Sequence, residues 1–136
     1  MLSLSDLLGK PAVIVFYPAD FSPVCSDQLA LYSELREEWD RLGARIVGIS
    51  VDGVWCHRAY RSQRNIWFPL LADFEPKGEV SRSFDAYRAQ EGVAERALFV
   101  LAPDGVVAWR YVSPIGVNPG ADGILEALER LQPEAA

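Results

Sequence analysis

Cys25 follows Ser22 and Pro23 in a segment that comes directly after a short apolar run. Serine is a favoured N-cap residue and proline suits the first position of a helix, so Ser22 and Pro23 predict a helix with Cys25 in its third position. A thiol at this position faces unpaired backbone N–H groups and the positive end of the helix dipole, and both favour the thiolate over the thiol. The pattern therefore predicts a reactive, nucleophilic cysteine.

The composition limits the classes of function that this cysteine can serve. The chain has 136 residues, of which 50% are apolar and 24% are charged, which predicts a single globular domain over residues 1–136. A formal net charge of −6 argues against nucleic acid and anionic membranes as partners. No apolar run is long enough to span a bilayer, and the first residues lack the features of a signal peptide. We therefore expect a cytoplasmic protein whose two cysteines serve chemistry rather than structure.

The other reactive side chains predict neither a metal site nor a cofactor. Two cysteines and one histidine do not supply the four close ligands that zinc prefers. His57 offers a hydrolase interpretation, with Cys25 as the nucleophile and His57 as its base. Because no hydrolase motif surrounds His57, we favour its interpretation as a polar residue at the start of a helix.

The elements that must position Cys25 alternate between strands and helices. Apolar periodicity and turn residues predict strands at 12–17 and 44–51, helices at 22–42, 55–65, 79–84 and 124–131, an edge segment at 68–73, and a hairpin of 97–101 with 106–112. This order predicts an α/β protein with a mixed central sheet flanked by helices. It is the order of the thioredoxin-like fold with an insertion before the final hairpin. That fold places its chemistry where the first strand leads into a helix.

The segment from Pro18 to Cys25 matches the pattern P-x-x-x-[ST]-x-x-C and resembles the active-site motif of the peroxiredoxins. The segments 48–57, 68–73 and 96–101 resemble further parts of that family in the expected order. The run 73–81 looks most similar to the one-cysteine alkyl hydroperoxide reductase E group. The resemblance implies a thioredoxin-like fold with a peroxiredoxin-type insertion, a thiol-dependent peroxidase and a homodimer. The resemblance also implies an N-terminal strand pair. Because residues 2–10 begin just before the first core strand, we expect this pair to be missing or shortened.

The resemblance assigns a role to each of four residues. Cys25 would be the nucleophile that attacks hydrogen peroxide, an organic hydroperoxide or peroxynitrite and becomes a sulfenate. Ser22 would hydrogen-bond the peroxide, and Pro18 would shield the pocket. Arg96 would stabilise the thiolate and the negative charge that develops as the O–O bond breaks.

Three further residues have supporting or open roles in this interpretation. Gln28 would orient the arginine, and backbone N–H groups near Val24 would add hydrogen-bond donors. Cys56 could be a resolving cysteine, but its position is not a usual one for that role, and a small helix-capping side chain is the favoured interpretation. We therefore expect a one-cysteine mechanism with an external thiol reductant, such as a thioredoxin or a glutaredoxin-like protein.

Two other functions stay open at this point. A thioredoxin-fold disulfide oxidoreductase normally uses a C-x-x-C motif, whereas Cys25 is followed by Ser26, Asp27 and Gln28. A peroxide sensor shares the sulfenate step with a peroxidase, so the sequence does not separate these two.

Overall fold

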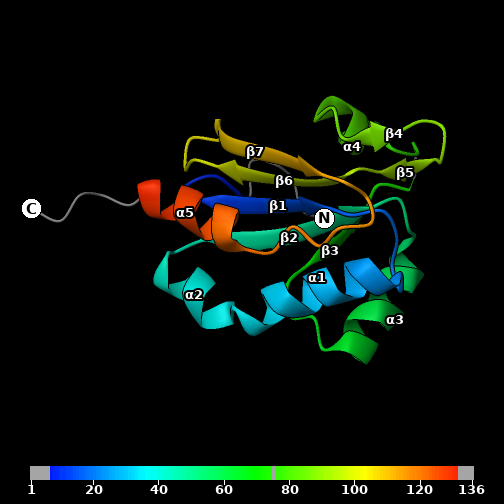
Figure 1. Cartoon of the computed structure of the whole chain (residues 1–136), viewed down its shortest axis with the longest axis horizontal. Coiled ribbons are helices and arrows are strands. Elements are labelled where there is room, and N and C mark those ends of the chain that lie inside the picture. Colours follow the sequence, from blue (N-terminus) through cyan, green and yellow to red (C-terminus); the bar gives the residue numbers. More distant parts are fainter. Residues whose placement is uncertain (1–6, 75, 132–136) are drawn as a thin grey trace, which may run out of the picture.

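In the computed structural model, a five-stranded mixed sheet forms the centre of the molecule (Figure 1). The structure describes residues 7–74 and 76–131, so most of the segment expected to precede the first strand lies outside the described residues. In sheet order, the strands are β3 (Leu70–Ala72), β2 (Arg45–Ser50), β1 (Ala12–Phe16), β6 (Arg96–Leu101) and β7 (Val107–Ser113). β1, β2 and β3 are parallel, while β6 and β7 run antiparallel to their neighbours. The mixed sheet, its edge segment β3 and its final hairpin follow the prediction.

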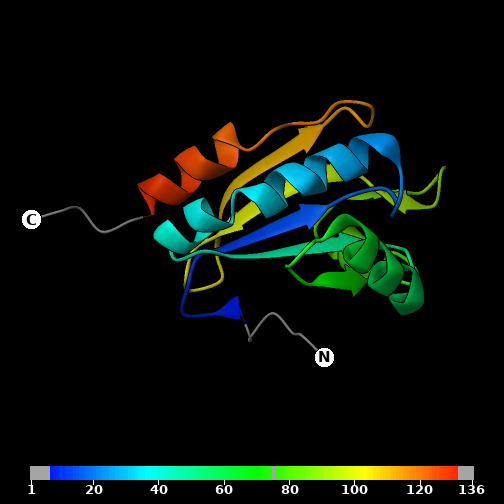
Figure 2. The same ribbon diagram turned by 90° about the horizontal axis from the view of Figure 1, so that it is seen from below.

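β1 is apolar throughout because it is buried on both faces. Val13 and Val15 point to one core. Three helices cover it, namely α1 (Pro23–Glu34), α2 (Arg36–Arg41) and α5 (Asp122–Arg130), and Tyr60 of α3 (Val54–Arg64) also belongs to it. Figure 2 shows α1, α2 and α5 along this face of the sheet. The alternate residues of β1 point to a second core, which Phe84, at the end of α4 (Glu79–Ser83), helps to cover. A strand between two cores gives the following loop a rigid base.

The helix expected over 22–42 is broken at Leu35, which separates α1 from α2. Trp39 and Trp67 explain the break. The indole N–H of Trp39 donates to the carbonyl of Tyr32 at 2.7 Å, and that of Trp67 donates to the carbonyl of Ser33 at 2.9 Å. In an unbroken helix these two carbonyls would accept backbone N–H groups four residues later. The indoles satisfy them instead, so the chain turns without leaving buried acceptors unpaired.

A small hairpin, β4 (Tyr87–Arg88) with β5 (Val93–Ala94), fills the insertion before β6 and was not predicted. Strands of two residues are too short to show an alternating pattern in the sequence. Among the described residues, no helix combines the length and the apolar character that crossing a membrane requires.

Candidate active site

The start of α1 holds Cys25 as the sequence predicts. Ser22 is the N-cap residue, with extended backbone angles (φ −71°, ψ 146°), and Pro23 begins the helix. The first helical bond runs from the Ser26 N–H to the Ser22 carbonyl at 2.8 Å. The N–H groups of Val24 and Cys25 precede this bond and have no acceptor within the helix. The Ser22 hydroxyl makes no capping bond, which leaves it available to a ligand.

Arg96, at the start of β6, reaches the sulfur of Cys25. Its Nη1 lies 3.3 Å from Cys25 Sγ and donates to Gln28 Oε1 at 2.8 Å. All three side chains are buried, with Arg96 only 2% exposed. A guanidinium without water around it interacts strongly with a nearby anion, so this contact places a positive charge where negative charge on the sulfur would be stabilised.

Further hydrogen bonds fix the position of Arg96. Its Nε donates to the Ile115 carbonyl at 2.8 Å. Gln28 Nε2 donates to the Tyr32 hydroxyl at 3.1 Å, and that hydroxyl donates to the Gly120 carbonyl at 2.8 Å. Burial raises the pKa of Tyr32 to about 12, so the hydroxyl keeps its proton for this bond. Tyr32, Ile115 and Gly120 were not foreseen, because each acts through Gln28 or Arg96 and belongs to no motif.

The sulfur of Cys25 is shielded from solvent in this structure. Cys25 is 0% exposed and Pro18 is buried, while Ser22 and Val24 are half-buried. A small substrate therefore reaches the sulfur only when a neighbouring side chain or the first turn of α1 moves. The same enclosure keeps water away and strengthens every electrostatic contact inside the site.

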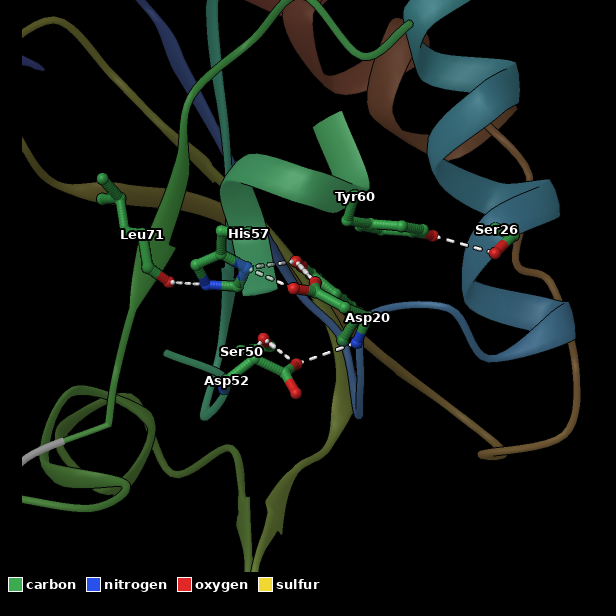
Figure 3. A network of polar contacts seen from close by, with 8 residues as sticks. Asp20, Ser26, Ser50, Asp52, His57, Tyr60 and Leu71 are labelled. Carbon is green, nitrogen blue, oxygen red and sulfur yellow. Dashed lines mark hydrogen bonds and ion pairs between the residues drawn. The ribbon is translucent and has the colours of Figure 1, made fainter. Parts of the chain in front are cut away.

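Tyr60 of α3 also contacts α1 (Figure 3). Its hydroxyl donates to Ser26 Oγ at 3.0 Å, and its ring centroid lies 4.8 Å from that of Phe21. Burial raises the pKa of Tyr60 to about 12, and the charge of Cys25 acts in the same direction. Tyr60 therefore remains a neutral hydrogen-bond donor beside the site.

His57 lies in the first turn of α3, as the favoured interpretation expects, and it is buried there. The hydrolase alternative, in which His57 is a base for Cys25, finds no support in its contacts. Its Nδ1 lies 2.7 Å from Asp20 Oδ2, and its Nε2 lies 3.0 Å from the Leu71 carbonyl (Figure 3). Both ring nitrogens are therefore engaged away from the sulfur.

Cys56 lies in a different environment from Cys25. Its sulfur and one carboxylate oxygen from each of Asp20 and Asp52 lie within 4.8 Å of one another. Burial, together with the hydrogen bond and charge of Asp20, raises the pKa of the Cys56 thiol to about 11. Both cysteines are free thiols in this structure. Cys56 is therefore a protonated, weakly nucleophilic thiol at neutral pH.

Comparison with known proteins agrees with this geometry. Residues 1–110 match the model of the AhpC/TSA family. The chain belongs to this family, the peroxiredoxins. It is 33% identical over 135 residues to alkyl hydroperoxide reductase C of Salmonella typhimurium, covering 96% of this chain and 71% of that protein. The family and the thioredoxin-like fold are thus confirmed, while membership of the alkyl hydroperoxide reductase E group stays a prediction.

This peroxiredoxin covers a different share of the length of each relative. The chloroplastic 2-Cys peroxiredoxin BAS1 of Hordeum vulgare is 32% identical over 139 residues, which cover 96% of this chain and 65% of that protein. This chain therefore spans just under two thirds of the barley relative. The crystal structure of Enterococcus faecalis AhpC superposes with a TM-score of 0.88 at 31% identity, covering 95% of this chain and 78% of that one.

Proposed function

We propose that the protein is a thiol-dependent peroxidase in which Cys25 is the nucleophile. The observation that carries this proposal is the 3.3 Å contact between Arg96 Nη1 and Cys25 Sγ in an enclosed site at a helix N-terminus. Membership of the AhpC/TSA family supports it. A C-x-x-C disulfide exchange is not supported, because Ser26, Asp27 and Gln28 follow Cys25.

The reaction proceeds by attack of the Cys25 thiolate on one oxygen of the peroxide. A sulfur–oxygen bond forms and the O–O bond breaks. The second oxygen leaves in water or an alcohol after taking a proton, or in nitrite when the substrate is peroxynitrite. The sulfur gives up two electrons and becomes a sulfenic acid. The negative charge moves from sulfur to the leaving oxygen, so the donors must serve both atoms.

The proposed donors come from Arg96 and from the start of α1. Arg96 is the cation that stabilises the thiolate and then the departing oxygen. The free hydroxyl of Ser22 and the N–H groups of Val24 and Cys25 add neutral donors. Gln28 keeps Arg96 in place, and buried Pro18 shields the pocket. Hydrogen peroxide, organic hydroperoxides and peroxynitrite all present the O–O group that this arrangement would bind.

A thiol reductant restores Cys25. Two thiols reduce the sulfenic acid, with release of water and formation of one disulfide. The raised pKa of Cys56 favours an external reductant, such as a thioredoxin or a glutaredoxin-like protein, over attack by Cys56. We place the reaction in a reducing compartment such as the cytoplasm, because a cysteine that must return to the thiol after each turnover needs a supply of reduced thiols.

Intact-mass measurement after one equivalent of hydrogen peroxide tests this mechanism. We expect the mass to rise by one oxygen, with the change on Cys25 and no disulfide on non-reducing gels. Cys56→Ser should behave in the same way, because Cys56 is held as a protonated thiol beside Asp20. A Cys25–Cys56 disulfide in the peptide map, lost in Cys56→Ser, would show that Cys56 resolves the sulfenate instead.

We also propose a homodimer formed through β7. This strand lies at one edge of the sheet and pairs only with β6 among the described residues. Apolar side chains are exposed along it and the turn before it, at Val106, Val107, Tyr111 and Val112. An unpaired strand edge with exposed apolar residues is a favourable surface for self-association.

Sedimentation velocity tests the proposed interface. The molar mass obtained for the wild-type protein should be twice that of the 15.1 kDa chain, and the molar mass of Tyr111→Glu should be that of the monomer. The matched control is Val54→Glu, which adds the same charge at an exposed apolar residue of α3 and should remain dimeric. A dimer that survives Tyr111→Glu but dissociates in Val54→Glu would place the interface at α3 rather than at β7.

A further inference from the structure

The loop between β1 and α1 carries Pro18 and Ser22, and Asp20 in its middle is anchored on three sides (Figure 3). The Asp20 side chain is 0% exposed. Its Oδ1 accepts a hydrogen bond from the Tyr17 hydroxyl at 2.5 Å. Its backbone N–H donates to Asp52 Oδ2 at 2.8 Å. The third contact is the one between Asp20 Oδ2 and His57 Nδ1.

The partners of His57 determine where its protons lie. The Leu71 carbonyl can only accept a hydrogen bond, so Nε2 of His57 carries a proton. On the other side, a 2.7 Å contact between Nδ1 and a carboxylate oxygen requires one proton between them. Imidazole is intrinsically the stronger base of the two, and Tyr17 already donates to the same carboxylate. The proton therefore lies on Nδ1, and both ring nitrogens of His57 are protonated.

We propose that His57 is a buried imidazolium and that, through Asp20, it positions the loop bearing Pro18 and Ser22 for the reaction at Cys25. His57 is a positioning residue in this account, since it touches Asp20 rather than the reacting atoms. The kinetic part of this inference rests on the proposed peroxidase function, whereas the protonation state does not.

The backbone of the loop shows why it needs such an anchor. Phe21 has a φ of 66°, a left-handed conformation that L side chains rarely adopt. Such a conformation persists only where surrounding contacts hold it. The contacts of Asp20 fix the backbone immediately before Phe21, and the Tyr60 ring packs on the Phe21 ring. His57 and Tyr60 lie one turn apart on α3, so this helix holds the strained loop at two points.

The other titratable groups around the pair of Asp20 and His57 are Tyr17, Cys56 and Asp52. Burial and the charge of Asp20 raise the pKa of Tyr17 far above its usual range, so Tyr17 stays a donor. The Cys56 thiol also stays protonated, with its pKa raised to about 11. Asp52 Oδ2 accepts the Asp20 N–H. Loss of the Nδ1 proton from His57 would set a lone pair against the Asp20 carboxylate and release the loop.

NMR of selectively ¹⁵N-labelled histidine tests the protonation state directly, because His57 is the only histidine in the chain. In the reduced wild-type protein at neutral pH, we expect both ring nitrogens to be protonated. In Asp20→Asn, the amide would donate to Nδ1, so Nδ1 should be unprotonated while Nε2 keeps its proton. An unprotonated Nδ1 in the wild-type protein would overturn the inference.

Two variants of His57 test the positioning role. Asparagine at 57 can place its side-chain nitrogen near the position of Nδ1 and donate to Asp20 without titrating, whereas leucine cannot. We expect His57→Leu to slow oxidation of Cys25 by peroxide about tenfold or more, since small displacements near a reacting centre are costly. His57→Asn should retain most of the rate, because its side chain still donates to Asp20.

Equal losses in both variants, or an unchanged rate in a folded His57→Leu, would overturn the positioning role. Near-ultraviolet circular dichroism establishes that each variant is folded. A failure of the proposed function would be seen separately, as slow oxidation of Cys25 in the wild type, and the NMR result would still decide the charge of His57.

Discussion

Cys25→Ser is expected to abolish peroxide consumption while leaving the fold intact. The hydroxyl of serine cannot form a sulfenate, and at neutral pH it is far less ionised than a thiol beside Arg96. The side chains are close in size, so the buried position should accept serine. The measurement is the loss of hydrogen peroxide with dithiothreitol as reductant, together with the circular dichroism spectrum.

Cys56→Ser is the matched control for this experiment, because it removes the other cysteine and should retain the activity. Residual turnover by Cys25→Ser at a substantial fraction of the wild-type rate would remove Cys25 from the reaction. Activity lost in Cys56→Ser and kept in Cys25→Ser would assign the nucleophile to Cys56 instead.

Arg96→Ala has the second largest expected effect. Charge-assisted hydrogen bonds contribute about 1.5–3 kcal/mol each, so we expect the rate constant for Cys25 oxidation to fall at least about tenfold. Stopped-flow kinetics with hydrogen peroxide measures this rate constant.

Arg41→Ala provides the control for the loss of a positive charge, since the Arg41 side chain is 55% exposed and pairs only on the surface, with Glu38 and Glu129. It should leave the rate constant for Cys25 oxidation unchanged. If Arg96→Ala left the rate constant unchanged, the contact with Cys25 would have no part in the chemistry. Arg96→Lys should recover part of the rate, because it restores the charge without the planar guanidinium.

The parts of the site that local rules determine were predictable from the sequence. Ser22 and Pro23 mark the start of α1 through capping and proline preferences, and these act over a few residues. The contact between Arg96 and Cys25 joins positions 71 residues apart. No local pattern contains that contact, and only the resemblance to a family brought the two residues together.

The features that were missed depend on tertiary contacts. The break at Leu35 occurs because the indole N–H groups of Trp39 and Trp67 donate to two backbone carbonyls of the helix. Helix propensities do not include such tertiary hydrogen bonds. His57 has the sequence context of an exposed residue at a helix start. Its burial follows from its partners Asp20 and Leu71, which lie on other elements of the fold.

The most direct test of the central claim is the rate at which hydrogen peroxide oxidises Cys25 in the reduced protein. Rapid mixing, with quenching and mass analysis, gives the second-order rate constant at neutral pH. We expect it to exceed that of free cysteine by about a hundredfold or more, because preorganised donors in an enclosed site stabilise the transition state. A rate constant no greater than that of free cysteine would contradict the account.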